Sequence, residues 1–221
     1  MPLKILYLST WDFTNEESEG VCKKIYSQIE VLEKAGHQVD FIYLKDNKIM
    51  YREAGKVYDV GLVGAIKKTP AYIRMYHILK EKKYDWVFNR YGMMDTFYFR
   101  VLKILKKNGA RILIELPTYP YIGEKNKGLL YWLMFKWDEV YQKKIKDVAE
   151  RIVTYSQDEE IWGIKTIRIK NGINLAEIPV VRREVKTDNS IHLLAVDRSM
   201  ILFGPGDHTV RHAVSVMSKK N

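Results

Sequence analysis

The stretch that decides the fold is KILYLS at residues 4–9, a short apolar run of strand length. A polar loop over residues 10–19 follows, and residues 20–35 then place their apolar side chains in a helical stripe that stops at Gly36. The next run, VDFIYL at residues 39–44, again reads as a strand. A strand, a helix and a second strand in this order predict two parallel strands joined by a crossover.

The same alternation continues along the chain. Short, continuously apolar runs of this kind predict parallel strands that are buried on both faces. We therefore expect an α/β fold with a doubly wound parallel sheet, whose ligands bind beyond the carboxyl ends of the strands, in the loops after Ser9, Phe88, Leu116 and Tyr155. The remaining predicted strands are 86–88, 111–116, 151–155 and 166–169, with short strands over 48–60; the remaining predicted helices are 70–82, 93–107, 129–148 and 157–161.

The composition limits the cellular compartments and the kinds of binding partner that we expect. The 221 residues include one cysteine, Cys22, and the N-terminus lacks the pattern of a signal peptide, so we expect a cytoplasmic, reducing location. The net charge of +10 favours nucleic acid, an anionic membrane surface or anionic small molecules. Because the lysines cluster near predicted helix ends, an ordinary basic surface is the alternative.

One segment favours the membrane among these partners. Residues 129–137 read LLYWLMFKW, and lysines follow at 143, 144 and 146. Aromatic residues beside lysines are typical of a helix at the membrane interface, so residues 129–146 predict peripheral attachment at the inner face. The alternative is a helix buried against the sheet. Nucleic acid ranks below both, because the sequence shows neither a recognition helix nor an aromatic platform motif.

Candidate site residues follow two of the predicted strands. Arg90 comes after the strand 86–88 and suits a phosphate or carboxylate, or a strand-end ion pair. Residues 115–121 read ELPTYPY, in which Glu115 is the candidate general base and Tyr119 and Tyr121 offer rings that stack on sugars. A structural cap or salt bridge is the alternative role of Glu115.

The first predicted helix offers a second candidate. Glu19 and Gly20 stand at its start, where free backbone N–H groups suit a phosphate, and the alternative is that they only cap the helix. The sequence has neither a G-x-G-x-x-G nor a G-x-x-x-x-G-K motif, so neither a dinucleotide nor a P-loop site is predicted. No metal site is predicted.

Several pieces in order resemble glycosyltransferase family 4. These are the strand at 4–9, GVCKKI at 20–25, LEKAGHQV at 32–39, RIVTYS at 151–156 and IRIKNGIN at 167–174. The resemblance covers residues 3–196. It implies the GT-B fold, in which two Rossmann-like domains face each other across a cleft. It also implies no cofactor, with a nucleotide-sugar as co-substrate.

The resemblance further divides the chain and assigns roles. Residues 1–174 match the acceptor-side domain, 175–196 a linker and the first strand (191–196) of a donor domain, and 197–221 match nothing in the family and are expected to be disordered. Glu19 and Gly20 would lie near the donor phosphates, and Asn171 and Gly172 would form the interdomain hinge. Glu115 remains the catalytic candidate, with Arg90, Tyr119 and Tyr121 on the acceptor.

The expected function is the acceptor-binding half of an enzyme that moves a sugar from a nucleotide-sugar to a glycan or lipid-linked acceptor in polysaccharide biosynthesis. No glutamate follows Glu184, so the family's Glu-x7-Glu donor motif is missing and the chain is expected to be inactive alone. The alternative is a non-enzymatic half domain that binds a glycan or pairs with a separate donor domain.

Overall fold

The computed structural model describes residues 1–14, 19–63, 69–92, 94–119 and 129–170. The chain divides into two units, Met1–Leu175 and Ala176–Asn221, and the description that follows concerns the first. The expected boundaries after residues 174 and 196, the hinge at Asn171 and Gly172, the strand 191–196 and Tyr121 all lie outside the described residues.

One mostly parallel sheet organises this unit, with nine strands among the described residues in the order β4-β3-β2-β1-β5-β6-β7-β9-β8. The parallel run from β2 to β9 is extended at one end by the antiparallel hairpin of β3 and β4 and at the other by β8. The strands are β1 Lys4–Asp12, β2 Gln38–Lys45, β3 Lys48–Glu53, β4 Lys56–Leu62, β5 Trp86–Arg90, β6 Arg111–Leu116, β7 Arg151–Thr154, β8 Glu160–Ile161 and β9 Ile164–Arg168.

Four α-helices connect the described strands, and local chemistry sets several of their ends. They are α1 Glu19–Lys34, α2 Thr69–Leu79, α3 Thr96–Lys107 and α4 Leu129–Lys144, which continues into a 3-10 turn, η3 Ile145–Asp147. Asp95 caps α3 by accepting hydrogen bonds from the backbone N–H groups of Phe97 and Tyr98. Gly36 ends α1 with a φ of +87°, a conformation that glycine adopts without strain.

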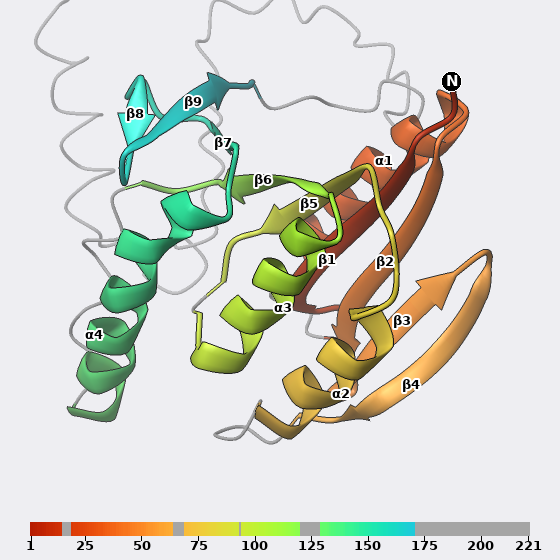
Figure 1. Ribbon diagram of the computed structural model, residues 1–221, viewed down its shortest axis with the longest axis horizontal. Coiled ribbons are helices and arrows are strands. Elements are labelled where there is room, and N and C mark those ends of the chain that lie inside the picture. Colours follow the sequence, from red (N-terminus) through yellow and green to blue (C-terminus); the bar gives the residue numbers. More distant parts are fainter. Residues whose placement is uncertain (15–18, 64–68, 93, 120–128, 171–221) are drawn as a thin grey trace, which may run out of the picture. The chain divides into compact units, whose positions relative to one another are not determined.

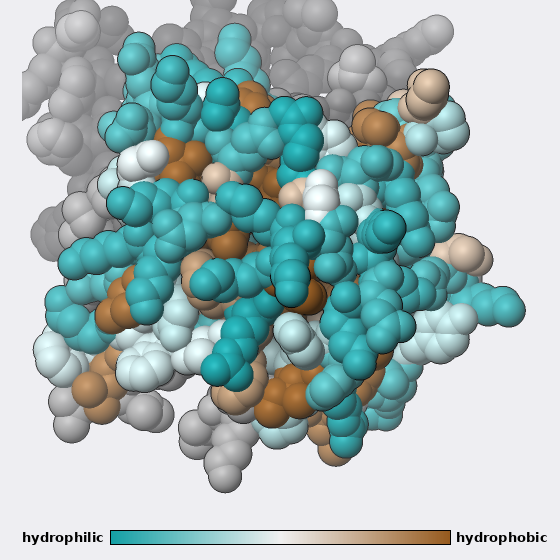
Figure 2. Space-filling model, in the orientation of Figure 1, coloured by the Kyte–Doolittle hydropathy of each residue, from teal (hydrophilic) through white to brown (hydrophobic). Residues whose placement is uncertain are grey.

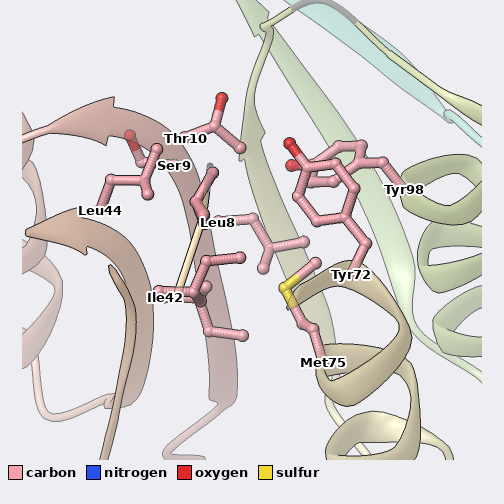
Figure 3. Close-up of a pocket in the computed structure, with 10 residues that line it drawn as sticks. Leu8, Ser9, Thr10, Ile42, Leu44, Tyr72, Met75 and Tyr98 are labelled. Carbon is pink, nitrogen blue, oxygen red and sulfur yellow. The ribbon is translucent and has the colours of Figure 1, made fainter. Parts of the chain in front are cut away.

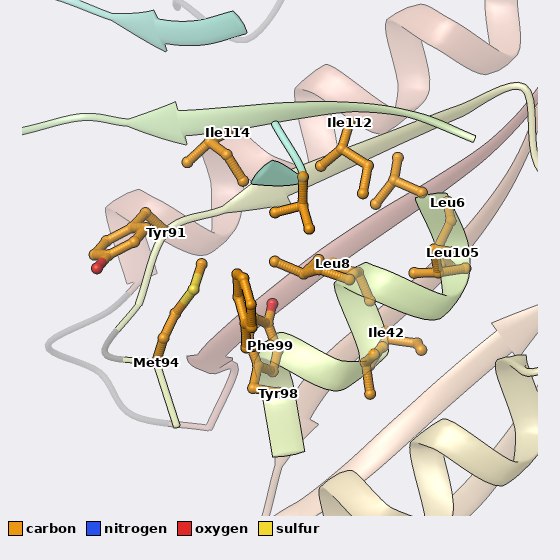
Figure 4. Close-up of a cluster of buried hydrophobic side chains, with 14 of the residues drawn as sticks. Leu6, Leu8, Ile42, Tyr91, Met94, Tyr98, Phe99, Leu105, Ile112 and Ile114 are labelled. Atoms are coloured by element: carbon orange, nitrogen blue, oxygen red, sulfur yellow. The ribbon is translucent and has the colours of Figure 1, made fainter. Parts of the chain in front are cut away.

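Helices cover both faces of the sheet, which confirms the doubly wound, Rossmann-like α/β prediction (Figure 1). Successive side chains of β1 point to opposite faces of the sheet. Tyr7 and its neighbours on one face pack against α1, whereas Leu8 and its neighbours belong to the larger core, which includes residues of α2 and α3 (Figure 4). Among the described residues, none of the helices combines the length and the apolarity that crossing a bilayer requires.

The predicted short helix at 157–161 is wrong, because this segment enters a β-hairpin. Ile161 pairs with Ile164 across a two-residue turn of Trp162 and Gly163, whose φ values are +53° and +79°. Positive φ at both positions matches the tight turn that suits the strand twist. Before the hairpin, the Asp158 carbonyl accepts a hydrogen bond from the Thr166 hydroxyl, which ties this segment to β9.

Candidate functional site

The structure brings Arg90 and Glu115 together. They are paired in register on the adjacent parallel strands β5 and β6, near the carboxyl ends of both, so their side chains project on the same face. The Arg90 Nη1 atom lies 2.7 Å from the Glu115 Oε2 atom. Arg90 is 3% exposed and Glu115 is fully buried, so this is an ion pair inside the protein. The ion pair that the sequence offered as the alternative role of Arg90, and the salt bridge that it offered for Glu115, are therefore present.

Helix α1 completes the environment of the carboxylate. Lys24 and Gln28 are four residues apart, so they lie on one face of the helix, toward the sheet. The Lys24 Nζ atom is 3.6 Å from Glu115 Oε1, and the Gln28 amide donates to the same oxygen at 3.3 Å. The Tyr7 hydroxyl lies 3.3 Å from Glu115 Oε2 and 2.7 Å from Gln28 Oε1. These five residues form what we call the Glu115 network.

The network carries two cations and one carboxylate, so its formal charge is positive. Burial lowers the pKa of Lys24, and the nearby Glu115 carboxylate acts against this effect. Burial also raises the pKa of Tyr7 well above its usual value, and the negative charge of Glu115 adds to the rise. Tyr7 therefore stays neutral, as a hydrogen-bonding group beside the ion pair.

Among the described residues, three buried polar atoms have no hydrogen-bond partner, and all three lie near the carboxyl ends of strands. They are Nδ2 of Asn89 and Nε of Arg90, both on β5, and the hydroxyl of Tyr155, the residue that follows β7. The Lys24 ammonium sits 4.1 Å from the centre of the Tyr155 ring, which connects β7 to the network. Unpaired buried polar atoms are rare in proteins. Their presence here, where a doubly wound sheet binds its ligands, marks this edge as the candidate site.

Aromatic rings gather at the same end of the strands. Tyr119 follows β6 and lies half-buried with its ring centre 6.2 Å from that of Trp162, in the β8–β9 turn. Trp162 in turn lies 5.1 Å from the Tyr91 ring. The Tyr91 hydroxyl donates to the buried carboxylate of Asp138 on α4 at 2.8 Å, and the Met94 backbone N–H donates to the same oxygen. Thus Tyr119 lies in the loop after β6, Trp162 lies in the β8–β9 turn, and Tyr91 is held by the hydrogen bond to Asp138 of α4.

Glu19 and Gly20 lie at the start of α1, and both are exposed. Glu19 pairs with Lys23 at 2.7 Å, one helical turn further on, and this pairing lowers the pKa of the Glu19 carboxyl. Within the described residues, no hydrogen bond or ion pair joins Glu19 to the Glu115 network. A Cβ atom added at Gly20 would meet nothing within 4 Å, so the approach to this position is open. A role for the two residues in holding donor phosphates stays a prediction.

Among the described side chains of α4, some are buried and others are exposed. Asp138 and Tyr141 are buried, whereas Trp132 and Trp137 are 49% and 57% exposed. Helix α4 therefore packs on the protein, as the buried-helix alternative for residues 129–146 expects, while it also presents aromatic rings to solvent. Attachment of these rings to a membrane stays a prediction. The rings of Tyr141 and Phe99, 5.3 Å apart, join α4 to α3.

A small cavity lies between β1 and the helices α2 and α3. Its volume is about 10 Å³, and its walls include Leu8, Ile42, Tyr72, Met75 and Tyr98 (Figure 3). A space of this size holds one water molecule and excludes a sugar or a nucleotide. It is a gap in the packing and is not a candidate ligand site.

Sequence reasoning found Arg90 and Glu115 but missed Tyr7, Lys24 and Gln28. The i, i+4 spacing of Lys24 and Gln28 indicates that they share one face of the helix. The prediction of this helix used its apolar positions alone, so this indication was missed. In the part of the chain that the structure describes, no group of three or more histidine, cysteine or acidic side chains is placed to hold a metal ion.

The fold defines a doubly wound α/β protein with a polar site at the carboxyl edge of its sheet. No protein-family model matches the chain, and no curated protein matches it.

Proposed function

We propose that residues 1–174 form the acceptor-side domain of a GT-B glycosyltransferase, which moves a sugar from a nucleotide-sugar to a glycan or lipid-linked hydroxyl. The observation that carries the proposal is the convergence, at one edge of a doubly wound sheet, of the Glu115 network with half-buried rings. Rings stack on the apolar faces of sugars, and cations attract phosphate or carboxylate groups.

In this proposal Tyr119 and Trp162 form the surface that receives the acceptor sugar, and Lys24 and Arg90 supply positive charge behind it. Transfer forms a bond from the acceptor oxygen to the sugar carbon and breaks the bond from that carbon to a phosphate oxygen. The nucleotide leaves with the electron pair of the broken bond, and its phosphate takes up the proton of the acceptor hydroxyl. Both Glu115 oxygens are occupied by donors and the side chain is fully buried. Its first role is therefore to position Arg90 and Lys24, and action as a base requires the carboxylate to become uncovered.

Glycan binding tests the proposal directly. Saturation-transfer NMR with the full chain and a panel of oligosaccharides should show contacts to sugar protons. The Y119A variant should bind about fivefold to tenfold more weakly, since one stacked ring is lost. The matched control is Y58A, which removes a tyrosine that is 46% exposed on β4, at the far end of the sheet.

Three outcomes separate the alternatives. Binding that Y119A weakens and Y58A leaves unchanged supports the acceptor site. Adding nucleotide-sugars then distinguishes an enzyme, which transfers the sugar, from a half domain that binds glycans without turnover or needs a separate donor domain. If no glycan binds, or if both variants lose binding equally, the proposed site is wrong.

A further inference from the structure

A basic groove runs between α2 and α3, apart from the Glu115 network. Its volume is about 560 Å³. Arg100, Lys103 and Lys107 lie three and four residues apart on α3, so their side chains share one face of the helix and line the groove together. Ile73 of α2 and Ile104 of α3 also line it. Hydrophilic side chains dominate the face that carries these two helices, with apolar patches between them (Figure 2).

The described lining of the groove is positively charged. All three cations are exposed, and none of the described acidic side chains lines the groove. Within the described residues, no ion pair joins Arg100, Lys103 or Lys107 to a carboxylate. By contrast, three ion pairs on α1 and α4 form within a single helical turn. The Arg100 guanidinium lies 5.4 Å from the centre of the Phe97 ring, on the groove wall. Such a surface suits an anion that brings apolar groups with it.

An apolar surface lies on the neighbouring helix. On α4, Trp132, Leu133, Trp137 and Val140 are each between 46% and 57% exposed. Tyr141 of α4 contacts α3 through the Phe99 ring and, at 2.6 Å, through the Thr96 hydroxyl. Helix α3 therefore carries the basic groove on one side and contacts α4 on the other. The two features belong to adjacent helices.

We propose that the helices α2, α3 and α4 form a surface that docks on an anionic phospholipid membrane. The groove cations would hold lipid phosphates, and Trp132 and Trp137 would lie at the level of the head groups. Exposed tryptophans beside lysines favour this partner over a purely polar polyanion. A second copy of the chain is disfavoured, because each copy carries a net charge of +10. The inference does not rest on sugar transfer.

Co-sedimentation of the full chain with lipid vesicles tests this surface. Phosphatidylcholine vesicles that contain about 30% phosphatidylserine should bind the chain, and vesicles of phosphatidylcholine alone should bind it far less. Each groove cation is expected to contribute about fivefold, so the R100Q/K103Q/K107Q variant should bind roughly a hundredfold more weakly.

The matched control is K45Q/K56Q/K165Q, which removes the same charge from three exposed lysines on strands. It should lose no more than a few fold, since its positions lie outside the three helices. The W132Q/W137Q variant should lose binding severalfold although its net charge is unchanged. All the substituted side chains are exposed, so circular dichroism should show an intact fold for each variant.

Several results would overturn the inference. One is an equal loss in the two triple variants, which would mean that net charge alone drives binding. Another is unchanged binding of W132Q/W137Q, and a third is the absence of a preference for phosphatidylserine. If a single-stranded oligonucleotide binds more tightly than the vesicles and depends on the three groove cations, the groove is a nucleic-acid surface instead.

Discussion

Replacing Glu115 with glutamine removes the one carboxylate of the Glu115 network and keeps the shape of the side chain. Arg90, which is 3% exposed, then remains as a buried cation without its counter-charge. Removing one partner of a buried ion pair costs about 3–5 kcal/mol. The Lys24 side chain is 26% exposed and can turn toward water, so we expect E115Q to lose about 3–4 kcal/mol of unfolding free energy.

A second variant separates the ion pair from its packing. In R90M/E115L, apolar side chains of similar volume replace both charges, and such replacements are often neutral. We expect this double variant to remain within about 1–2 kcal/mol of the wild type, and so to be more stable than E115Q. The control E30Q breaks an exposed pair with Lys34 on α1 and should change the unfolding free energy by less than about 0.5 kcal/mol.

Urea unfolding followed by circular dichroism measures all three variants. For a domain of this size, the loss in E115Q corresponds to a fall in Tm of roughly 10 °C. An E115Q variant that unfolds within about 1 kcal/mol of the wild type would contradict this prediction, because the buried charges would then be compensated by something other than the carboxylate. A lower stability of R90M/E115L than of E115Q would contradict it as well.

Two further predictions concern single positions. Burial raises the pKa of Asp138, and the hydrogen bonds that its carboxylate accepts, first among them that from Met94, act against the rise without cancelling it. The folded chain therefore holds this proton more tightly than the unfolded chain, so this group makes the unfolding free energy fall as pH rises from about 4 through the raised pKa. Relative to D138N, the wild type should gain stability between pH 7 and pH 4 in urea unfolding; a constant difference would contradict the assigned shift. Gly36 has a φ of +87° whereas Gly20 lies in helical backbone with open space around it, so G36A should cost about 1 kcal/mol and G20A should gain about 0.5–1 kcal/mol in thermal unfolding. Equal effects of the two substitutions would show that backbone conformation does not decide them.

Much of the fold was predictable from the sequence, because strand-length apolar runs alternate with helical stripes. The hairpin at Trp162 was not, since a bulky residue at positive φ is a poor candidate for a turn and the preceding polar residues resemble a helix start. In the site, Arg90 and Glu115 were found because both sit at strand ends. Their register, which makes them partners, depends on how β5 and β6 align. Lys24 and Gln28 were missed because a helix read by its apolar positions does not show which polar side chains reach into the sheet.

The turn at Trp162 also bears on how this chain can be engineered. Asparagine adopts a φ of +53° with less strain than tryptophan does, so a turn with asparagine at position 162 would be more stable than the turn with tryptophan. Its indole, however, is what connects the rings of Tyr91 and Tyr119. Engineering for stability would therefore replace Trp162 early. The replacement would raise the Tm but would remove the contacts of the indole with the rings of Tyr91 and Tyr119. Selection for thermostability in this chain therefore needs a binding screen beside it.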